Sequence, residues 1–344
     1  MRSKIRDKIV DYLRIFRAQT APVEVCVFLS GYLCKPDIIQ INPLLLIPLI
    51  IIEHCFAYGH NSLMDTAMGY DIQDPHKKHH PLVAGRVSMH EAHNVLNWGL
   101  LILSTVFALL SFMAANPTMA LFCLFLAMAG GYAYNCGLSK ESLLSFVPIA
   151  LYNSMFAGWA WYMTHYQLGK LGLAFVAYIF TVITFQIGWE GFLKDIKTGE
   201  RSNLLRVLGC RVIRVIDLGD KKIKAVFEWL IIPPRAMTVA LIMKLAQVVT
   251  SAYIVNVLRT ASKLVWWAVV MLLSIILWWN MVMTREYDHE KDLKLMSFHE
   301  VLMFFLPLPI MTTWGIAVIT MMGCLSWFML MNRVLWGTGT HPKV

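Results

Sequence analysis

Charged side chains are scarce in this sequence. They account for 15% of the 344 residues, whereas 58% of the residues are hydrophobic. An average soluble domain carries about 25% charged residues and a smaller apolar fraction. The shortage of charge therefore excludes an ordinary soluble domain and predicts an integral membrane protein.

Paired cysteine motifs are also missing. The seven cysteines show no CxxC spacing and no other spacing typical of a metal site, and most of them lie in apolar runs. We therefore interpret them as small, buried and inert thiols rather than as a disulfide framework or a metal site. They are Cys26, Cys34, Cys55, Cys123, Cys136, Cys210 and Cys324.

No secretory signal peptide is expected, because the basic opening of the chain is not followed by a small-residue cleavage site. In this opening Ile5, Ile9, Leu13 and Phe16 recur at spacings of three and four between Arg and Lys residues. The pattern predicts an amphipathic helix over residues 1–18 that lies on an anionic membrane surface.

Nine apolar runs are long enough to cross the membrane, since a helix needs roughly 17 to 25 residues to span about 30 Å of hydrocarbon. We expect these nine helices to form one domain over residues 19–334, followed by a tail over residues 335–344. The runs fall near residues 19–35, 42–59, 94–115, 117–134, 143–164, 170–192, 237–258, 264–284 and 300–331.

Lys and Arg residues are divided unevenly between the predicted loops. With the N-terminus inside, the inner segments hold 23 of them and the outer segments hold 6, while Lys244 lies inside the seventh run. Cytoplasmic loops carry an excess of Lys and Arg, so this division places the N-terminus on the cytoplasmic side. It also accounts for the net charge of +9 without a nucleic-acid partner. The six outer residues are Lys35, Lys170, Arg259, Lys263, Arg333 and Lys343.

The densest polar stretch, Gly59 to Ser88, follows the second run on the cytoplasmic side. Its Asn61 and Asp65 are four residues apart and so share one face of a helix. Asp71 and Asp74 lie beyond Gly69, where we expect the helix to loosen into a loop. Carboxylate and amide oxygens of this kind suit Mg²⁺, which is usually held by one or two carboxylates together with substrate phosphates.

A second acidic stretch, residues 188–209, follows the sixth run on the same side. Glu190, Asp195 and Glu200 are candidate ligands for a second Mg²⁺. Two ions bridging a diphosphate would neutralise it and make it a leaving group. Four cations could donate charge-assisted hydrogen bonds to the same diphosphate oxygens. These cations are Lys77, Lys78, Lys194 and Arg201.

Plainer interpretations exist for each of these features. The first stretch could be a solvated cytoplasmic loop, and Glu190 with Lys194 could be a simple i,i+4 helix salt bridge. Lys244 could place its ammonium in the interface by snorkelling. His54, His60 and His93 are more typical of interfacial or hydrogen-bonded residues than of metal ligands.

Taken together, the motifs resemble the UbiA superfamily of intramembrane prenyltransferases, whose first motif is N-D-x-x-D-x-x-x-D followed by a basic loop ending in R-P-L-x-S-G. Asp71 to Ser88 matches this pattern without a gap, with His80-Pro81-Leu82 in the place of R-P-L. Lys194-Asp195-Ile196 is similar to the second motif, K-D-I-x-D-x-x-G-D. A third, weaker match is Gly131 to Tyr134 followed by Lys140.

Three departures from the family pattern lie in the first motif. Ser62 replaces the Asp after the Asn, two extra residues separate Asp65 from Asp71, and His80 stands where Arg is usual. These positions are where the chemistry of this protein could differ from that of its relatives.

The resemblance implies an all-α membrane protein of nine transmembrane helices around a central cavity, with cytoplasmic cap loops after helices 2 and 6. It implies transfer of a polyprenyl group from a polyprenyl diphosphate to a small acceptor, with two Mg²⁺ ions as cofactor. One ion would be held by Asn61, Asp65, Asp71 and Asp74, and the other by Asp195 with Glu190 or Glu200. The diphosphate would be held by Lys77, Lys78, Arg86, Lys140, Lys194 and Arg201.

Two other functions stay open at this point. One is a UbiA-type terpene cyclase, in which the prenyl chain captures its own cation. The other is a transporter or scaffold without catalytic activity, for which charged groups in the middle of helices are more typical than acids at helix ends. The acceptor is also open: an aromatic acid or quinone precursor, a porphyrin and a glycerol phosphate lipid are all compatible with the resemblance.

Overall fold

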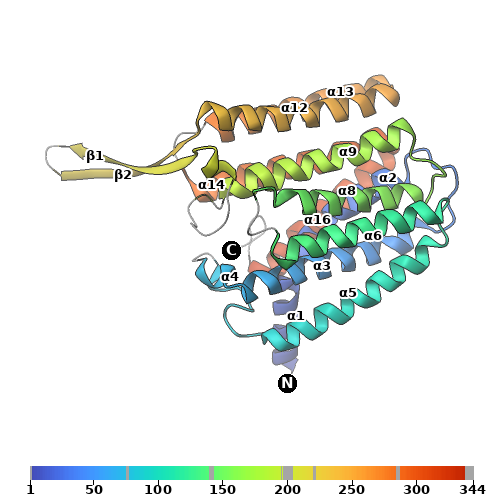
Figure 1. The fold of residues 1–344 in the computed structure, drawn as a ribbon, viewed down its shortest axis with the longest axis horizontal. Helices are drawn as coiled ribbons and strands as arrows, with labels where there is room; N and C mark the ends of the chain where they lie inside the picture. The colour runs from blue at the N-terminus through green and yellow to red at the C-terminus, as the bar shows by residue number, and fades with distance from the viewer. Residues whose placement is uncertain are drawn as a thin grey trace.

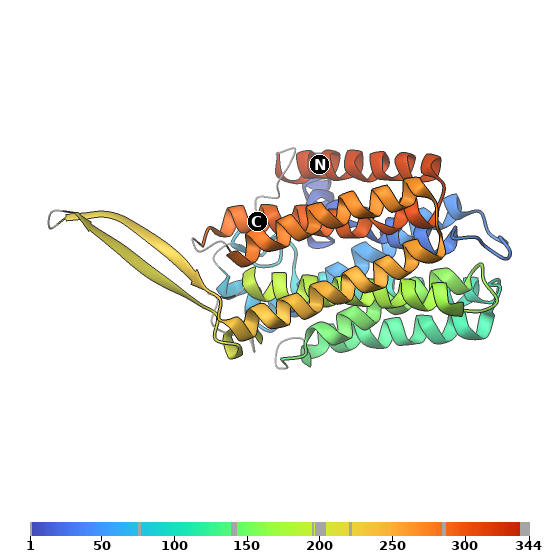
Figure 2. The same ribbon diagram turned by 90° about the horizontal axis from the view of Figure 1, so that it is seen from above.

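The computed structural model of the chain describes residues 2–74, 77–138, 143–194, 196, 204–219, 222–283 and 287–337. The described residues form a bundle of long helices that run up and down alongside one another, and a two-stranded hairpin projects from one end (Figures 1 and 2). The helix α4 and the hairpin lie at the same end of the bundle, which we call the motif end. The predicted helical membrane bundle is confirmed.

The long helices are α3 (Pro43–Ala67), α5 (Met89–Ser111), α6 (Pro117–Ala133), α9 (Gly169–Phe185), α12 (Pro234–Val257), α13 (Ala261–Met283), α14 (His289–Phe305) and α16 (Trp314–Trp336). Shorter ones are α1 (Arg2–Ile15), α2 (Pro22–Tyr32), α4 (Tyr70–Gln73), α8 (Phe146–Tyr162), α10 (Phe192–Lys194), α11 (Leu204–Val207) and α15 (Pro307–Met311). A 3₁₀ turn, η1 (Ala18–Thr20), and two π-helices, η3 (Tyr134–Leu138) and η4 (Gln186–Gly191), complete the helical elements.

Eight segments of the described chain are long and apolar enough to cross a membrane, by length and composition. The helix α2, with 11 residues, is shorter than the usual span but lies inside the bundle, and α8, with 17 residues, is at the lower limit of that length. Local sequence sets where several spans begin. Asn42 and Asn116 cap α3 and α6 through their side chains, and each is followed by Pro at the first helical position.

The predicted single span over residues 300–331 is wrong. Lys291–Met311 forms one candidate span and Trp314–Trp336 forms another, because the chain becomes extended at Thr312. Thr313 then caps the new helix by accepting a hydrogen bond from the backbone of Ile316.

The end of α16 lies beside α1. The Arg14 guanidinium donates to the backbone carbonyl of Leu335 over 2.9 and 2.6 Å. Arg333 therefore belongs to the motif end, and its predicted position on the opposite side is wrong. Moving this one residue changes the predicted division of Lys and Arg from 23 against 6 to 24 against 5, which strengthens the charge asymmetry.

A β-hairpin precedes α12. Its strands β1 (Arg211–Gly219) and β2 (Lys222–Ile231) pair antiparallel, with Arg211 opposite Ile231 and Arg214 opposite Glu228. Val and Ile occupy many strand positions, as pleated backbone favours. Figure 2 shows the hairpin extending well beyond the helices.

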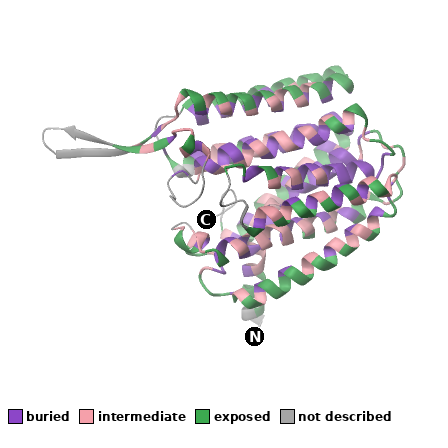
Figure 3. Ribbon diagram, viewed as in Figure 1, coloured by how far each residue is buried: buried purple, intermediate pink, exposed green. Residues whose placement is uncertain are grey.

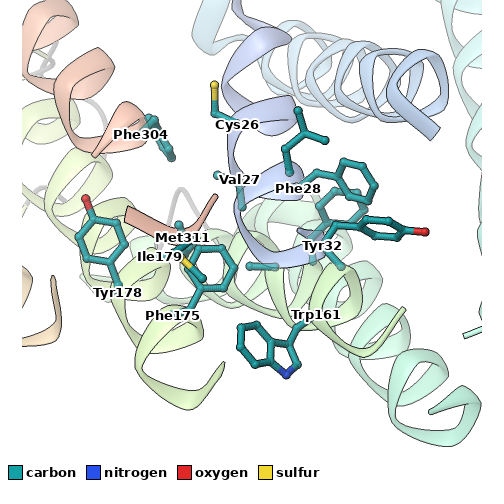
Figure 4. Close-up of a cluster of buried hydrophobic side chains, with 14 of the residues drawn as sticks. Cys26, Val27, Phe28, Tyr32, Trp161, Phe175, Tyr178, Ile179, Phe304 and Met311 are labelled. Atoms are coloured by element: carbon teal, nitrogen blue, oxygen red, sulfur yellow. The ribbon is translucent and has the colours of Figure 1, made fainter. Parts of the chain in front are cut away.

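The main core lies where α2, α8 and α9 meet, and exposed residues are concentrated on the outer helix faces (Figure 3). Phe28, Trp159 and Phe175 are fully buried there (Figure 4 shows part of this cluster). Close packing depends on Gly31, because a Cβ at that position would lie 2.8 Å from the Phe175 ring. Six of the seven cysteines are buried and all seven are free, so the prediction of buried thiols is confirmed except at the exposed Cys136.

Candidate functional site

The first acidic stretch is built on the end of α3. Asn61 and Asp65 lie on its last turns and share a face, and the Asn61 amide donates to Asp65 over 3.2 Å. The helix α3 ends before Gly69, as predicted, but the chain continues as the short helix α4 rather than as a loop. Gly69 makes the turn between the two helices with a φ of +84°, which Gly adopts without strain. The turn brings Asp71 to the same end, where its side chain is buried.

Lys77 folds back onto these acids. Its ammonium donates to Asp71 Oδ1 over 2.6 Å. Burial lowers the pKa of Lys77, with the positive charges of Arg17 and Lys194 adding to the effect, while Asp71 and Asp65 oppose it. Lys194 of the second predicted motif thus contributes to the electrostatics at Lys77.

The loop after Lys77 is anchored by apolar contacts. Leu82 and Val87 are buried against Ile15 of α1 and Leu63 of α3. Burial, together with the charges of Arg17 and other nearby cations, lowers the pKa of His80 to about 3. His80 is therefore neutral at physiological pH, so it supplies no charge at a position where the family usually has Arg.

Three other residues predicted for the site are Arg86, Lys78 and Asp74. Arg86 forms an ion pair with Asp11 of α1, with Nε 3.0 Å from the carboxylate, and donates to the His79 carbonyl. Lys78 is exposed, and Asp74 is half-buried just after α4. The described geometry thus brings Asn61, Asp65, Asp71 and Lys77 together and directs Arg86 toward α1.

Glu190 of the second motif lies in the π-helix η4 and is part of a buried polar network. His299 Nδ1 of α14 is 2.8 Å from Glu190 Oε1, and the other imidazole nitrogen is 2.8 Å from the Lys244 ammonium of α12. Lys244 also contacts Gln247 and, from α13, Ser274. These three ionisable residues are 1 to 3% exposed, so the snorkelling interpretation of Lys244 is wrong.

Sequence reasoning missed His299 and the carboxylates Glu24 and Glu53. Glu24 and Glu53 lie within predicted spans, and His299 directly precedes the last predicted span. An ionisable residue in a span is itself a signal of function. Their partners could not be named from the sequence because they come from different helices. Four predicted site residues, Lys140, Asp195, Glu200 and Arg201, lie outside the described residues.

The donor set of the first motif fits a hard cation. Asn61 Oδ1 and Asp71 Oδ2 are buried and accept no hydrogen bond within the described chain. A buried oxygen without a donor is costly unless a ligand satisfies it, and oxygen is the ligand that Mg²⁺ prefers. No group of three His, Cys, Asp or Glu side chains converges among the described residues, so water and substrate oxygens would complete the coordination of an ion here.

Comparison with known proteins gives a family match over most of the chain. The model of the UbiA prenyltransferase family matches residues 25–308. No curated protein matches the sequence. A solved UbiA homolog from Archaeoglobus fulgidus bound to DMAPP and Mg²⁺ is similar in fold, with a TM-score of 0.58, 15% identity, and coverage of 88% of this chain and 99% of that one.

Two further solved structures have the same fold. The A. fulgidus homolog bound to GPP and Mg²⁺ has a TM-score of 0.59 and 14% identity, with coverage of 88% of this chain and 99% of that one. A structure described as that of digeranylgeranylglyceryl phosphate synthase has a TM-score of 0.54 and 16% identity, with coverage of 91% and 99%. At such low identity these likenesses establish the fold alone.

Proposed function

Because the chain belongs to the UbiA prenyltransferase family, we propose that it transfers a polyprenyl group from a polyprenyl diphosphate to a small acceptor, with Mg²⁺ as cofactor. The proposal rests on one observation: Asn61, Asp65, Asp71 and Lys77 lie together at one end of an apolar helix bundle. Asn61 donates to Asp65, and Lys77 donates to Asp71. Oxygen ligands beside a buried lysine are what a metal-bound diphosphate requires.

The diphosphate would bind at the motif end. Mg²⁺ held by Asn61, Asp65, Asp71 and Asp74 would neutralise the diphosphate and make it a better leaving group. Lys77 would exchange its contact with Asp71 for a diphosphate oxygen, and Lys194 would approach from the second motif. By analogy with the first motif, Asp195 with Glu190 or Glu200 would hold a second ion.

Glu200 is the better partner for Asp195 in this proposal. Glu190 already faces His299, and that imidazole contacts Lys244. A carboxylate that already takes part in a buried network of ionisable residues is less available to a metal ion, so we assign the second ion to Asp195 and Glu200.

Bond breaking separates the allylic carbon from the diphosphate oxygen, and pyrophosphate leaves with the electron pair. A nucleophilic carbon or oxygen of the acceptor then bonds to the allylic carbon, and the acceptor loses one proton. The cation must meet the acceptor before it meets water. Fully buried apolar residues beside the second motif, including Phe185 and Trp189, would help to exclude water there.

The proposal is tested by release of pyrophosphate from a labelled polyprenyl diphosphate by the purified chain. Asp65→Asn and Asp71→Asn should each remove the Mg²⁺-dependent release, because each replaces an anionic ligand by a neutral side chain of the same shape. Asp7→Asn, at an exposed position of α1, is the matched control and should leave release unchanged. Full activity in both site variants would refute the assignment of these residues.

A further inference from the structure

Two glutamates, the buried Glu24 and the half-buried Glu53, lie inside the bundle and away from both acidic motifs. Glu24 lies on α2 and Glu53 on α3. The Tyr152 hydroxyl of α8 donates to Glu53 Oε1, and His54 Nδ1 is 3.8 Å from Glu24 Oε1. Glu53 and His54 are consecutive residues of α3, so the contact of His54 with Glu24 places the two carboxylates in one neighbourhood. We call Glu24, Glu53, His54 and Tyr152 the inner acidic cluster.

Several buried polar atoms of this cluster have no hydrogen-bond partner within the described chain. Within the described chain, Glu24 Oε2, Glu53 Oε2 and His54 Nδ1 are buried and make no hydrogen bond. Glu24 and His54 are 3% and 2% exposed, so solvent does not satisfy them. Carboxylates retained only for packing would have donors for both oxygens, because an unsatisfied buried polar group is destabilising. The free oxygens indicate a ligand that brings its own donors.

The cluster lies deeper in the bundle than the first motif. Glu53 precedes Asn61 by eight residues of α3, which corresponds to about 12 Å along the helix axis. His54 precedes Asn61 by seven residues and so lies on the same face of α3. About 12 Å is comparable to a diphosphate group followed by a small acceptor of one or two rings.

We propose that the inner acidic cluster binds the acceptor through its hydroxyl hydrogens, and that the acceptor is a neutral hydroxyl-bearing molecule rather than a carboxylic acid or a phosphate ester. This inference rests on the proposed prenyl transfer. Glu24 and Glu53 accept hydrogen bonds from hydroxyl groups, whereas an anionic group would face two carboxylates in surroundings of low dielectric constant. Like charges about 6 to 12 Å apart at an effective dielectric constant of about 20 disfavour binding by about a hundredfold to tenfold.

The test uses a matched pair of probes, 1,4-dihydroxynaphthalene and its 2-carboxylate, which differ only in the anionic group. Binding is measured to the full chain with Mg²⁺ and a non-reactive prenyl thiolodiphosphate present. The native protein should bind the neutral probe at least about tenfold more tightly than the carboxylate. Glu24→Gln and Glu53→Gln should each reduce this ratio toward one, because glutamine keeps the shape and removes the charge.

Two further variants complete the test. Glu91→Gln is the matched control: this residue pairs with Lys8 and Tyr12 near the start of α5, and its replacement should leave the ratio unchanged. Tyr152→Phe keeps both glutamates and removes the donor to Glu53, so it should widen the ratio even if a glutamine variant does not fold. Tighter binding of the carboxylate, an unchanged ratio in every folded cluster variant, or binding of neither probe would overturn the inference.

A pyrophosphate assay on the same preparations separates this inference from the proposed function. Mg²⁺-dependent release of pyrophosphate without any charge preference among acceptors would refute the acceptor assignment alone. No release with any acceptor would refute the prenyl transfer itself.

Discussion

Lys244→Met removes one member of the buried network of Glu190, His299 and Lys244, and methionine retains most of the lysine volume. The three side chains are 1 to 3% exposed and are joined by two contacts of 2.8 Å. Breaking a buried ionic network by removing one partner costs about 3–5 kcal/mol, because the remaining charge stays buried without compensation. We therefore expect a large loss of stability although the substitution changes little in shape.

Thermal unfolding of the purified full chain in detergent measures this loss. A second variant that also carries Glu190→Gln and His299→Leu removes every charge of the network, and it should recover much of the stability that Lys244→Met loses. A single variant that unfolds within about 0.5 kcal/mol of the native protein would refute the network, since that is the range of an ordinary surface substitution.

The same variants address the role of Glu190. If Glu190 serves the network, Lys244→Met and Glu190→Gln should both lower stability, while the Mg²⁺ concentration for half-maximal pyrophosphate release stays near the native value. A rise in that concentration of about tenfold or more in Glu190→Gln alone would instead assign Glu190 to the metal site.

Other consequences of the structure can be tested more simply. The pKa of Lys77 is lowered, so its charge is lost at a lower pH than that of an ordinary lysine. The affinity of the native protein for the diphosphate, measured with a labelled ligand, should therefore fall as pH rises through that range. Lys77→Met should bind the diphosphate weakly at every pH. His80 has a pKa of about 3, so His80→Gln should leave the dependence of pyrophosphate release on pH unchanged between about pH 5 and 8, where histidine usually titrates, and a changed profile would show that His80 carries charge there. Gly31→Val should lower the thermal unfolding midpoint through a loss of about 1–3 kcal/mol, because even its Cβ would lie 2.8 Å from the Phe175 ring; an unchanged midpoint would contradict the packing of α2 against α9.

The first acidic motif was predictable because its signals are local. Asn61 and Asp65 are one helical turn apart, and Gly69 ends the helix where a positive φ is needed. Charged residues beside apolar, membrane-spanning sequence identified the stretch. The Lys and Arg content of the loops predicted which side of the membrane it faces. The ion pair of Asp71 with Lys77 was not predicted, although both residues lie in this short segment.

Features that depend on distant residues were not predictable. The network of Glu190, His299 and Lys244 joins three helices that are far apart in the sequence, and hydropathy says nothing about which polar groups meet. The separation of α15 from α16 was missed for another reason. Apolar residues continue across Thr312 and Thr313, so only the backbone geometry reveals the break and the reversal of the chain.

The β-hairpin was not predicted, because its basic residues were counted only as part of a cytoplasmic loop. Its Val and Ile residues around a Gly-Asp pair, Gly219 and Asp220, were a usable signal for two paired strands.

The central claim is that this chain transfers a prenyl group to an acceptor. Purified protein incubated with Mg²⁺, a labelled polyprenyl diphosphate and a membrane extract should yield a product whose mass is that of the acceptor plus the prenyl group minus one hydrogen, and this product should be absent when Mg²⁺ is removed. A cyclised hydrocarbon or alcohol formed without any acceptor, or a diphosphate that stays intact, would contradict the account.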